Sequence, residues 1–186
     1  MKKADPLLII DVQNGFLNDF TRHIPERVMR LIETREYDPI YFSIFVNVAD
    51  SVYHRLLDWH DCVDEPDTCV ARELQPLVTA DNLFYKNGFA GLPKPLASQL
   101  REQGVTRIAV VGIDTDMCVL KSALDLFDLG IEPIILTDCC ASTAGLQAHF
   151  AGLAILSRNI GPRQLRATGL GGELLAAPTK TGETSG

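Results

Sequence analysis

Short apolar runs alternate with stretches of helical periodicity along most of the chain. A run of about four to eight apolar residues between turn residues is typical of a buried strand, and apolar residues that recur every three or four positions indicate an amphipathic helix. These patterns predict strands at Leu7–Asp11, Pro39–Val46, Leu83–Lys86, Arg107–Val111 and Pro133–Thr137. They predict helices at Pro25–Arg35, Ser51–Trp59, Lys94–Gln103, Met117–Leu129 and Gly145–Leu156.

The ends of the predicted helices carry residues that such ends favour. Pro25 suits the first turn of its helix, and Gly104 and Gly130 follow the third and fourth helices, where glycine readily takes the left-handed conformation that ends a helix. Alternating strands and helices indicate a parallel sheet joined by right-handed crossovers. We therefore expect an α/β fold: a single-domain, Rossmann-like three-layer sandwich with a mostly parallel sheet of about six strands.

The length of 186 residues and the apolar share of 46% fit one globular domain with a sizeable core. We place this domain at residues 1–170. The segment 171–186 is rich in Gly, Thr and Ala, and we expect it to be a disordered tail.

Charge and cysteine content narrow the class of protein. The net charge of −7 and the scattered basic residues argue against a nucleic-acid partner. Near the N-terminus, the apolar run Leu7–Ile10 is too short for a secretory signal or a membrane span. The five cysteines are odd in number and do not suggest a disulfide framework. We expect a cytoplasmic protein with reduced thiols and no membrane partner.

Candidate chemistry gathers at the carboxyl ends of three predicted strands. The segment Val110–Leu120 is typical of a buried strand, a tight turn and a helix that begins near Cys118. A helix N-terminus favours a thiolate over a thiol, and its free N–H groups can hold a developing oxyanion. Asp11 and Lys86 close two other predicted strands, and in a parallel sheet such ends meet at one edge. An acid, an ammonium and a thiol are therefore expected in one site.

These three side chains together suit the hydrolysis of a carbon–nitrogen bond. The Cys118 sulfur would attack a carbonyl carbon, Asp11 would pass the thiol proton to the leaving amine, and Lys86 would stay cationic. The N–H groups of Asp114 and Cys118 are candidates for an oxyanion hole. Each residue alone also fits a structural role, as a turn residue, a solvated lysine or a core thiol. The prediction therefore depends on the combination.

The chain resembles the isochorismatase-like cysteine hydrolases, the superfamily that includes nicotinamidases and N-carbamoylsarcosine amidases. The stretches that carry the resemblance are Leu8–Phe16, Lys86 and Gly112–Val119, in that order and spacing. The similarity extends from about Leu7 to Ile160, which is most of the chain.

This resemblance implies a catalytic triad of Asp11, Lys86 and Cys118. It implies a cis peptide bond between Ile113 and Asp114, in the turn before the cysteine. It also implies a small-molecule substrate with an amide, carbamoyl or ureido group, and assembly into a homo-oligomer, either a dimer or a higher state.

The chain departs from the resemblance where the family's nicotinamidases carry a metal. Those relatives have an Asp-x-His pair and a further histidine after the second strand, and the pair is absent from Phe45–His54. We therefore expect no metal cofactor, with a cluster of Asp50, His54 and His60 as the alternative. Isochorismatases proper lack the nucleophilic cysteine, so Cys118 favours cleavage of a C–N bond.

Residues from several loops are expected to wall the substrate pocket. They are Asn14, Phe16, Asn47, Trp59 and Phe89. Trp59 and the phenylalanines equally fit a core role, and Asn14 fits a turn. The segments 47–68 and 87–94 would determine which substrate is bound, and the acidic stretch Asp61–Asp67 is a candidate lid.

Three other functions compete with a cysteine hydrolase. A catalytically silent relative would act as a binding or scaffold protein, and its thiol would react slowly with alkylating agents. A nicotinamidase with an atypical metal site would use the Asp50 cluster. A dinucleotide-dependent oxidoreductase is disfavoured, because Asp11–Phe16 holds one glycine and lacks the Gly-x-Gly-x-x-Gly pattern.

Overall fold

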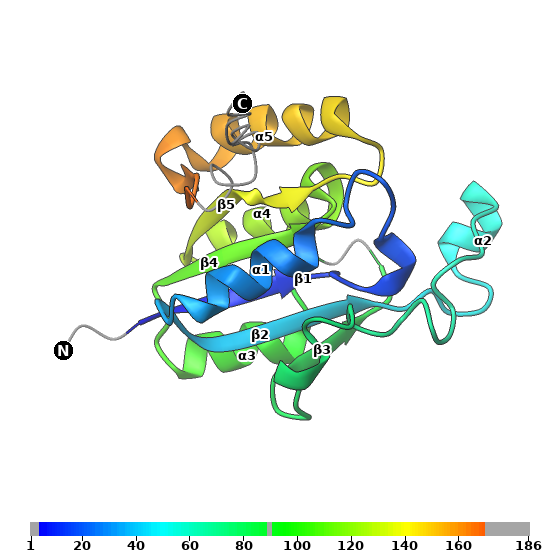
Figure 1. The fold of residues 1–186 in the computed structure, drawn as a ribbon, viewed down its shortest axis with the longest axis horizontal. Helices are drawn as coiled ribbons and strands as arrows, with labels where there is room; N and C mark the ends of the chain where they lie inside the picture. The colour runs from blue at the N-terminus through cyan, green and yellow to red at the C-terminus, as the bar shows by residue number, and fades with distance from the viewer. Residues whose placement is uncertain (1–3, 89–90, 170–186) are drawn as a thin grey trace, which may run out of the picture.

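The computed structural model describes residues 4–88 and 91–169, so Phe89 and the expected tail at 171–186 lie outside the described residues. Within the described part, six strands form one parallel sheet in the order β3–β2–β1–β4–β5–β6 (Figure 1). This confirms the predicted α/β class. The strands are β1 (Asp5–Ile10), β2 (Tyr37–Phe45), β3 (Leu83–Lys86), β4 (Arg107–Ile113), β5 (Glu132–Ala141) and β6 (Leu165–Arg166).

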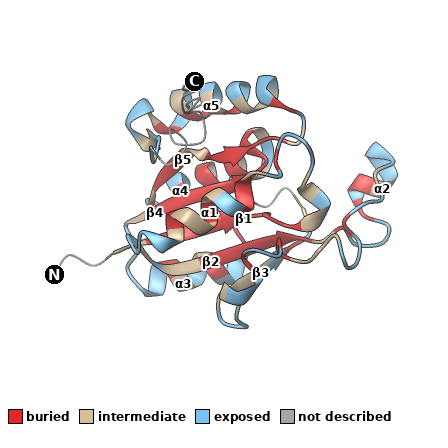
Figure 2. Cartoon of the chain, viewed as in Figure 1, coloured by how far each residue is buried: buried red, intermediate tan, exposed pale blue. Residues whose placement is uncertain are grey.

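Helices cover both faces of the sheet. They are α1 (Ile24–Glu33), α2 (Val52–Leu57), α3 (Lys94–Glu102), α4 (Leu120–Asp128) and α5 (Leu146–Ile160). One core contains residues of α1 together with Leu7 and Ile9 of β1, and the other contains residues of α3, α4 and α5 together with Leu8 and Ile10. Because alternate side chains enter different cores, β1 is apolar without interruption. Figure 2 shows the central strands as buried.

The short helix α2 lies beyond the carboxyl ends of β1 and β2, at the right of Figure 1. Ser51, the first residue of the predicted helix, caps α2: its side chain accepts a hydrogen bond of 3.2 Å from the His54 N–H. None of the described helices is both long and apolar enough to cross a membrane.

The predicted helix at Met117–Leu129 differs from the structure at its start. We expected the helix to begin at Met117, but α4 begins at Leu120 and is preceded by a π-helical turn at Thr115–Val119. In this turn the Val119 N–H donates to the Asp114 carbonyl over 2.9 Å, five residues back. Such turns widen the helix locally, so Cys118 lies within a π turn instead of opening an α-helix.

Gly112 allows β1 and β4 to approach each other closely beside this turn. Its φ is +129°, and a Cβ atom there would lie 2.0 Å from the Ile10 carbonyl oxygen. No other residue type fits such a position without moving a strand. The carboxyl end of β1, where Asp11 follows, is thereby held beside the carboxyl end of β4, which leads to Cys118.

Candidate active site

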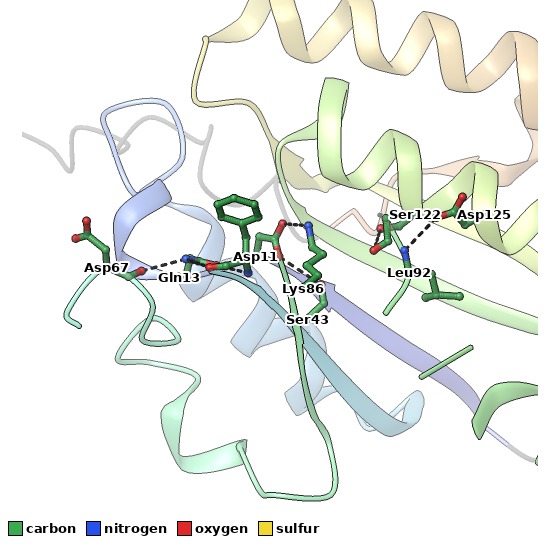
Figure 3. A network of polar contacts seen from close by, with 10 residues as sticks. Asp11, Gln13, Ser43, Asp67, Lys86, Leu92, Ser122 and Asp125 are labelled. Carbon is green, nitrogen blue, oxygen red and sulfur yellow. Dashed lines mark hydrogen bonds and ion pairs between the residues drawn. The ribbon is translucent and has the colours of Figure 1, made fainter. Parts of the chain in front are cut away.

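A buried ion pair joins two of the three predicted catalytic residues. The Lys86 Nζ lies 2.6 Å from the Asp11 Oδ2, and the two side chains are 2% and 0% exposed (Figure 3). Lys86 is the last residue of β3, and Asp11 follows the end of β1 with a positive φ of 51°. Ser43 of β2, between these strands, donates a hydrogen bond of 3.4 Å from its hydroxyl to the Asp11 Oδ1.

The Cys118 thiol interacts with both members of this ion pair. Burial raises the pKa of Cys118 well above its ordinary value, and the Asp11 charge raises it further, while Lys86 acts in the opposite direction. The expectation that this position favours a thiolate is therefore wrong for the free site. The cause is burial beside a carboxylate, which outweighs the nearby ammonium.

Lys86 and Asp11 both stay charged, and their surroundings favour proton transfer to Asp11. Burial raises the pKa of Asp11, although Lys86 opposes that shift. Burial alone would lower the pKa of Lys86, but the charge of Asp11 and its hydrogen bond raise it. The ammonium therefore stays protonated, while the carboxylate is more basic than an exposed aspartate and can accept the thiol proton.

Gln13, which the sequence analysis did not single out, fixes the end of β1. Its side-chain amide donates to the Phe45 carbonyl over 3.0 Å and to the Asp67 carbonyl over 3.1 Å, and its oxygen accepts from the Phe45 N–H over 2.9 Å (Figure 3). This buried amide ties β1 to β2 and to the acidic loop. Ser43 was also missed, although its position as a lone polar residue inside an apolar strand could have indicated its role.

A cavity of about 320 Å³ opens above Cys118. Phe16 and Trp59, two of the residues expected to wall a substrate pocket, line this cavity, with ring centroids 6.4 Å apart and planes inclined by 12°. Its other lining residues are Gly15, Asn18, Phe45, Tyr53, Leu57, Asp61, Asp114, Met117 and Thr143. The volume suits a small molecule.

Two predicted pocket residues, Asn14 and Asn47, are not among those that line the cavity. Asn14 donates from its side chain to the Pro66 carbonyl over 3.0 Å, which matches the alternative of a turn-shaping role. Asn47 is buried, and its side chain donates to the carbonyls of Trp59 and Asp61 over 3.1 Å each. It therefore holds the loop that carries two lining residues and does not face the cavity itself.

The turn between β4 and Cys118 forms one side of the cavity. The peptide bond between Ile113 and Asp114 is cis. The Asp114 carboxylate accepts hydrogen bonds from the backbone N–H of Thr143 and, over 2.9 Å, from its hydroxyl. Burial raises the pKa of Asp114 to about 6, although the Thr143 bonds oppose that shift.

Among the described residues, those weighed as a metal cluster do not gather into one group with a third ligand. The rings of His54 and His60 lie 4.4 Å apart, but His60 pairs with Asp58 over 3.0 Å. Asn47 follows β2, in the segment that lacks the Asp-x-His pair. Its side-chain amide already donates to the carbonyls of Trp59 and Asp61. Across residues 4–88 and 91–169, no three His, Cys, Asp or Glu side chains are grouped to hold an ion.

The other cysteines differ from Cys118 in their surroundings. Cys139 and Cys140 are buried in the sheet, and Cys62, within the acidic loop, is buried against Phe45 and Tyr53. Burial, together with nearby aspartates, raises the pKa of Cys62 to about 12. Cys69 is partly exposed and lies outside the cavity.

Comparison with known proteins places the chain in a family. Residues 6–164 match the family model of the isochorismatase domain. The chain is 28% identical over 170 residues to nicotinamidase 3 of Arabidopsis thaliana, covering 84% of this chain and 85% of that one.

Solved structures share the fold. An isochorismatase-like hydrolase from Alkaliphilus metalliredigens superposes with a TM-score of 0.74 at 19% identity, covering 92% of this chain and 98% of the other. The N-carbamoylsarcosine amidase of Thermoplasma acidophilum superposes with a TM-score of 0.71 at 20% identity, covering 86% and 94%. With the family model matched over most of its length, the chain belongs to the isochorismatase family.

Proposed function

We propose that this protein is a cysteine-dependent hydrolase that cleaves an amide, carbamoyl or ureido C–N bond of a small molecule. Its nicotinamidase and amidase relatives support a hydrolase acting on carbon–nitrogen bonds. One observation carries the proposal: a thiol, a carboxylate and an ammonium, from turns and strands far apart in sequence, interact at the base of a single cavity.

The first half of the reaction forms a thioester. The Cys118 sulfur attacks the carbonyl carbon as its proton moves to the Asp11 carboxylate, so the thiolate need not exist beforehand. The backbone N–H groups of Asp114 and Cys118 hydrogen-bond the oxyanion. When the C–N bond breaks, the proton on Asp11 moves to the departing nitrogen, which leaves as ammonia or an amine.

The second half consumes one water molecule. Asp11 takes a proton from the water as its oxygen attacks the thioester carbonyl, and the C–S bond breaks. The proton then returns to the Cys118 sulfur, which restores the thiol, and the acid product leaves. Lys86 stays cationic throughout and balances the charge that appears on sulfur and on Asp11.

Ammonia release from a panel of small primary amides, carbamoyl compounds and ureido compounds tests this proposal. We expect release with the wild type and none above background with Cys118→Ala or Asp11→Asn. Cys69→Ala, which removes a thiol outside the cavity, is the matched control and should retain full activity. Full activity in Cys118→Ala would refute the nucleophile. No release by the wild type, with a thiol inert to alkylation, would favour the silent binding protein.

A further inference from the structure

The charged groups that line the cavity are all of one sign. Among the described lining residues, the ionisable carboxyl groups are those of Asp61 and Asp114, and no Lys, Arg or His is present. Lys86 is not among the lining residues, and its charge is already paired with Asp11. The rest of the lining is mostly apolar, with Phe16, Phe45, Tyr53, Leu57, Trp59 and Met117. A bound carboxylate would therefore find no cation to compensate its lost hydration.

Asp61 is held with one carboxylate oxygen left for a ligand. The indole N–H of Trp59 donates to its Oδ2 over 3.1 Å, while the Asn47 side chain fixes its backbone carbonyl. Its Oδ1 accepts no hydrogen bond from the described part of the chain. The exposed carboxylate is thus positioned at the cavity by two contacts while it keeps an acceptor for an N–H group or a cation.

The loop around the cavity adds further negative charge. Between positions 58 and 67 the chain carries five acidic residues and no lysine or arginine, within a protein of net charge −7. A rim of one sign raises the local concentration of oppositely charged ligands and lowers that of like-charged ones, over roughly 10 Å at moderate salt. Approach to the cavity therefore favours neutral and cationic molecules.

We propose that this site takes neutral or cationic amides with a flat apolar body and excludes amides that carry a carboxylate. In this assignment, which rests on the proposed function, Asp61 is the specificity-determining residue. The Asp61 carboxylate accepts a hydrogen bond from an N–H or ammonium group of the substrate, and the aromatic side chains of the cavity contact the flat apolar body of the substrate. Ureido acids and N-carbamoyl amino acids are thereby disfavoured. The acid product, being an anion, is repelled by the charges that admit the amide.

Three amides that share a benzene ring test this preference for neutral and cationic amides over carboxylates, which we call the charge rule. They are benzamide, 4-carboxybenzamide and 4-(aminomethyl)benzamide. We expect the kcat/KM for ammonia release to be about tenfold or more lower for the carboxylate than for the cationic compound at low salt. Added salt should narrow that ratio, because it screens the rim. The ratio should also narrow in Asp61→Asn, which preserves an acceptor for Trp59 but removes the charge. Asp128→Asn, the same change at an exposed position at the end of α4, should not alter it.

Binding to Cys118→Ala, measured by calorimetry, separates this inference from the proposed function. If the wild type releases ammonia as readily from the carboxylate as from the cationic compound, the charge rule is refuted and the hydrolase stands. If no compound is hydrolysed but the variant binds them in the predicted order, the charge rule stands and the proposed reaction is refuted for these amides. Binding of none of the three, or preferential binding of the carboxylate, would overturn the assignment.

Discussion

At the scale of single residues, the ion pair of Asp11 and Lys86 bears on stability as well as on the proposed reaction. Each charge is buried, and each compensates the other over 2.6 Å. Removing one member of such a pair leaves an uncompensated buried charge, which costs more than the pair itself contributes.

We therefore predict that Asp11→Asn and Lys86→Met each lower the free energy of unfolding by about 3–5 kcal/mol. The double variant should lose clearly less than the sum of the two, since both charges are then gone. Urea denaturation of the four proteins measures this coupling, and all three variants should be inactive. Strictly additive losses would mean that the pair is not coupled in the folded protein.

Asp114 makes stability depend on pH. Burial raises its pKa from 3.8 to about 6, so its contribution favours the folded state at low pH and is lost as the pH rises through about 6. Asp114→Asn has no such ionisation. We expect the free energy of unfolding of Asp114→Asn, relative to wild type, to rise by about 2 kcal/mol between about pH 4.5 and about pH 7.5. A difference that stays constant across this range would contradict the assignment.

Sequence reasoning located the candidate catalytic residues better than it described their state. Asp11 and Lys86 stand at strand ends and Cys118 in the turn after β4, and the geometry of a parallel sheet brings these positions together. The protonation of Cys118 depends on burial by residues distant in sequence, which a local pattern does not contain. The role of Asn47 was missed for the same reason, because its partners lie twelve and fourteen residues further along the chain.

At the scale of elements, the π turn that carries Cys118 packs directly against α5. A Cβ atom on Gly152 of α5 would lie 2.8 Å from the backbone N and Cα of Asp116. This contact sets the position of the turn relative to the sheet. The sequence predicted the helix but not this contact, because a glycine inside a helix shows no pattern of its own.

We predict that Gly152→Ala displaces the turn and lowers kcat by about ten- to a hundredfold. Overpacking should cost about 1–3 kcal/mol of stability. Ala154→Gly, at an exposed position of the same helix, is the control: it should lose about 1 kcal/mol from helix propensity yet keep its kcat. A normal kcat in Gly152→Ala would show that the turn tolerates the shift.

The elements that escaped prediction are short or irregular. β6 has two residues, too few for any periodicity, and the π turn interrupts what looked like one helix. β5 runs to Ala141, beyond the expected Thr137, because its register with β4 shifts near Gly112 and pairing then resumes. Long, strongly periodic segments such as α3 and β2 were found to within two residues.

At the scale of the whole molecule, the described strands and both cores lie between Asp5 and Arg166. The boundary expected near residue 170 stays a prediction. A chain ending at Gly169 should keep its activity and its free energy of unfolding to within about 0.5 kcal/mol, the usual range for changes outside the packed core. A larger loss would show that the last residues contact the domain.

The parallel sheet was predictable because every apolar run is followed by a helical pattern. The order of the strands was not, since local periodicity does not record which strands pair. That order has consequences, because it places β3 at one edge of the sheet, paired with β2 alone among the described strands.

The last residue of this four-residue edge strand supplies the ammonium of the candidate site. Edge strands generally open at a lower free energy than central ones. The ion pair therefore also links the edge strand β3 to the end of the central strand β1. If β3 separates from the sheet, Asp11 loses its counter-charge while the central strands and their helices remain folded. Activity would therefore be lost well before the whole protein unfolds.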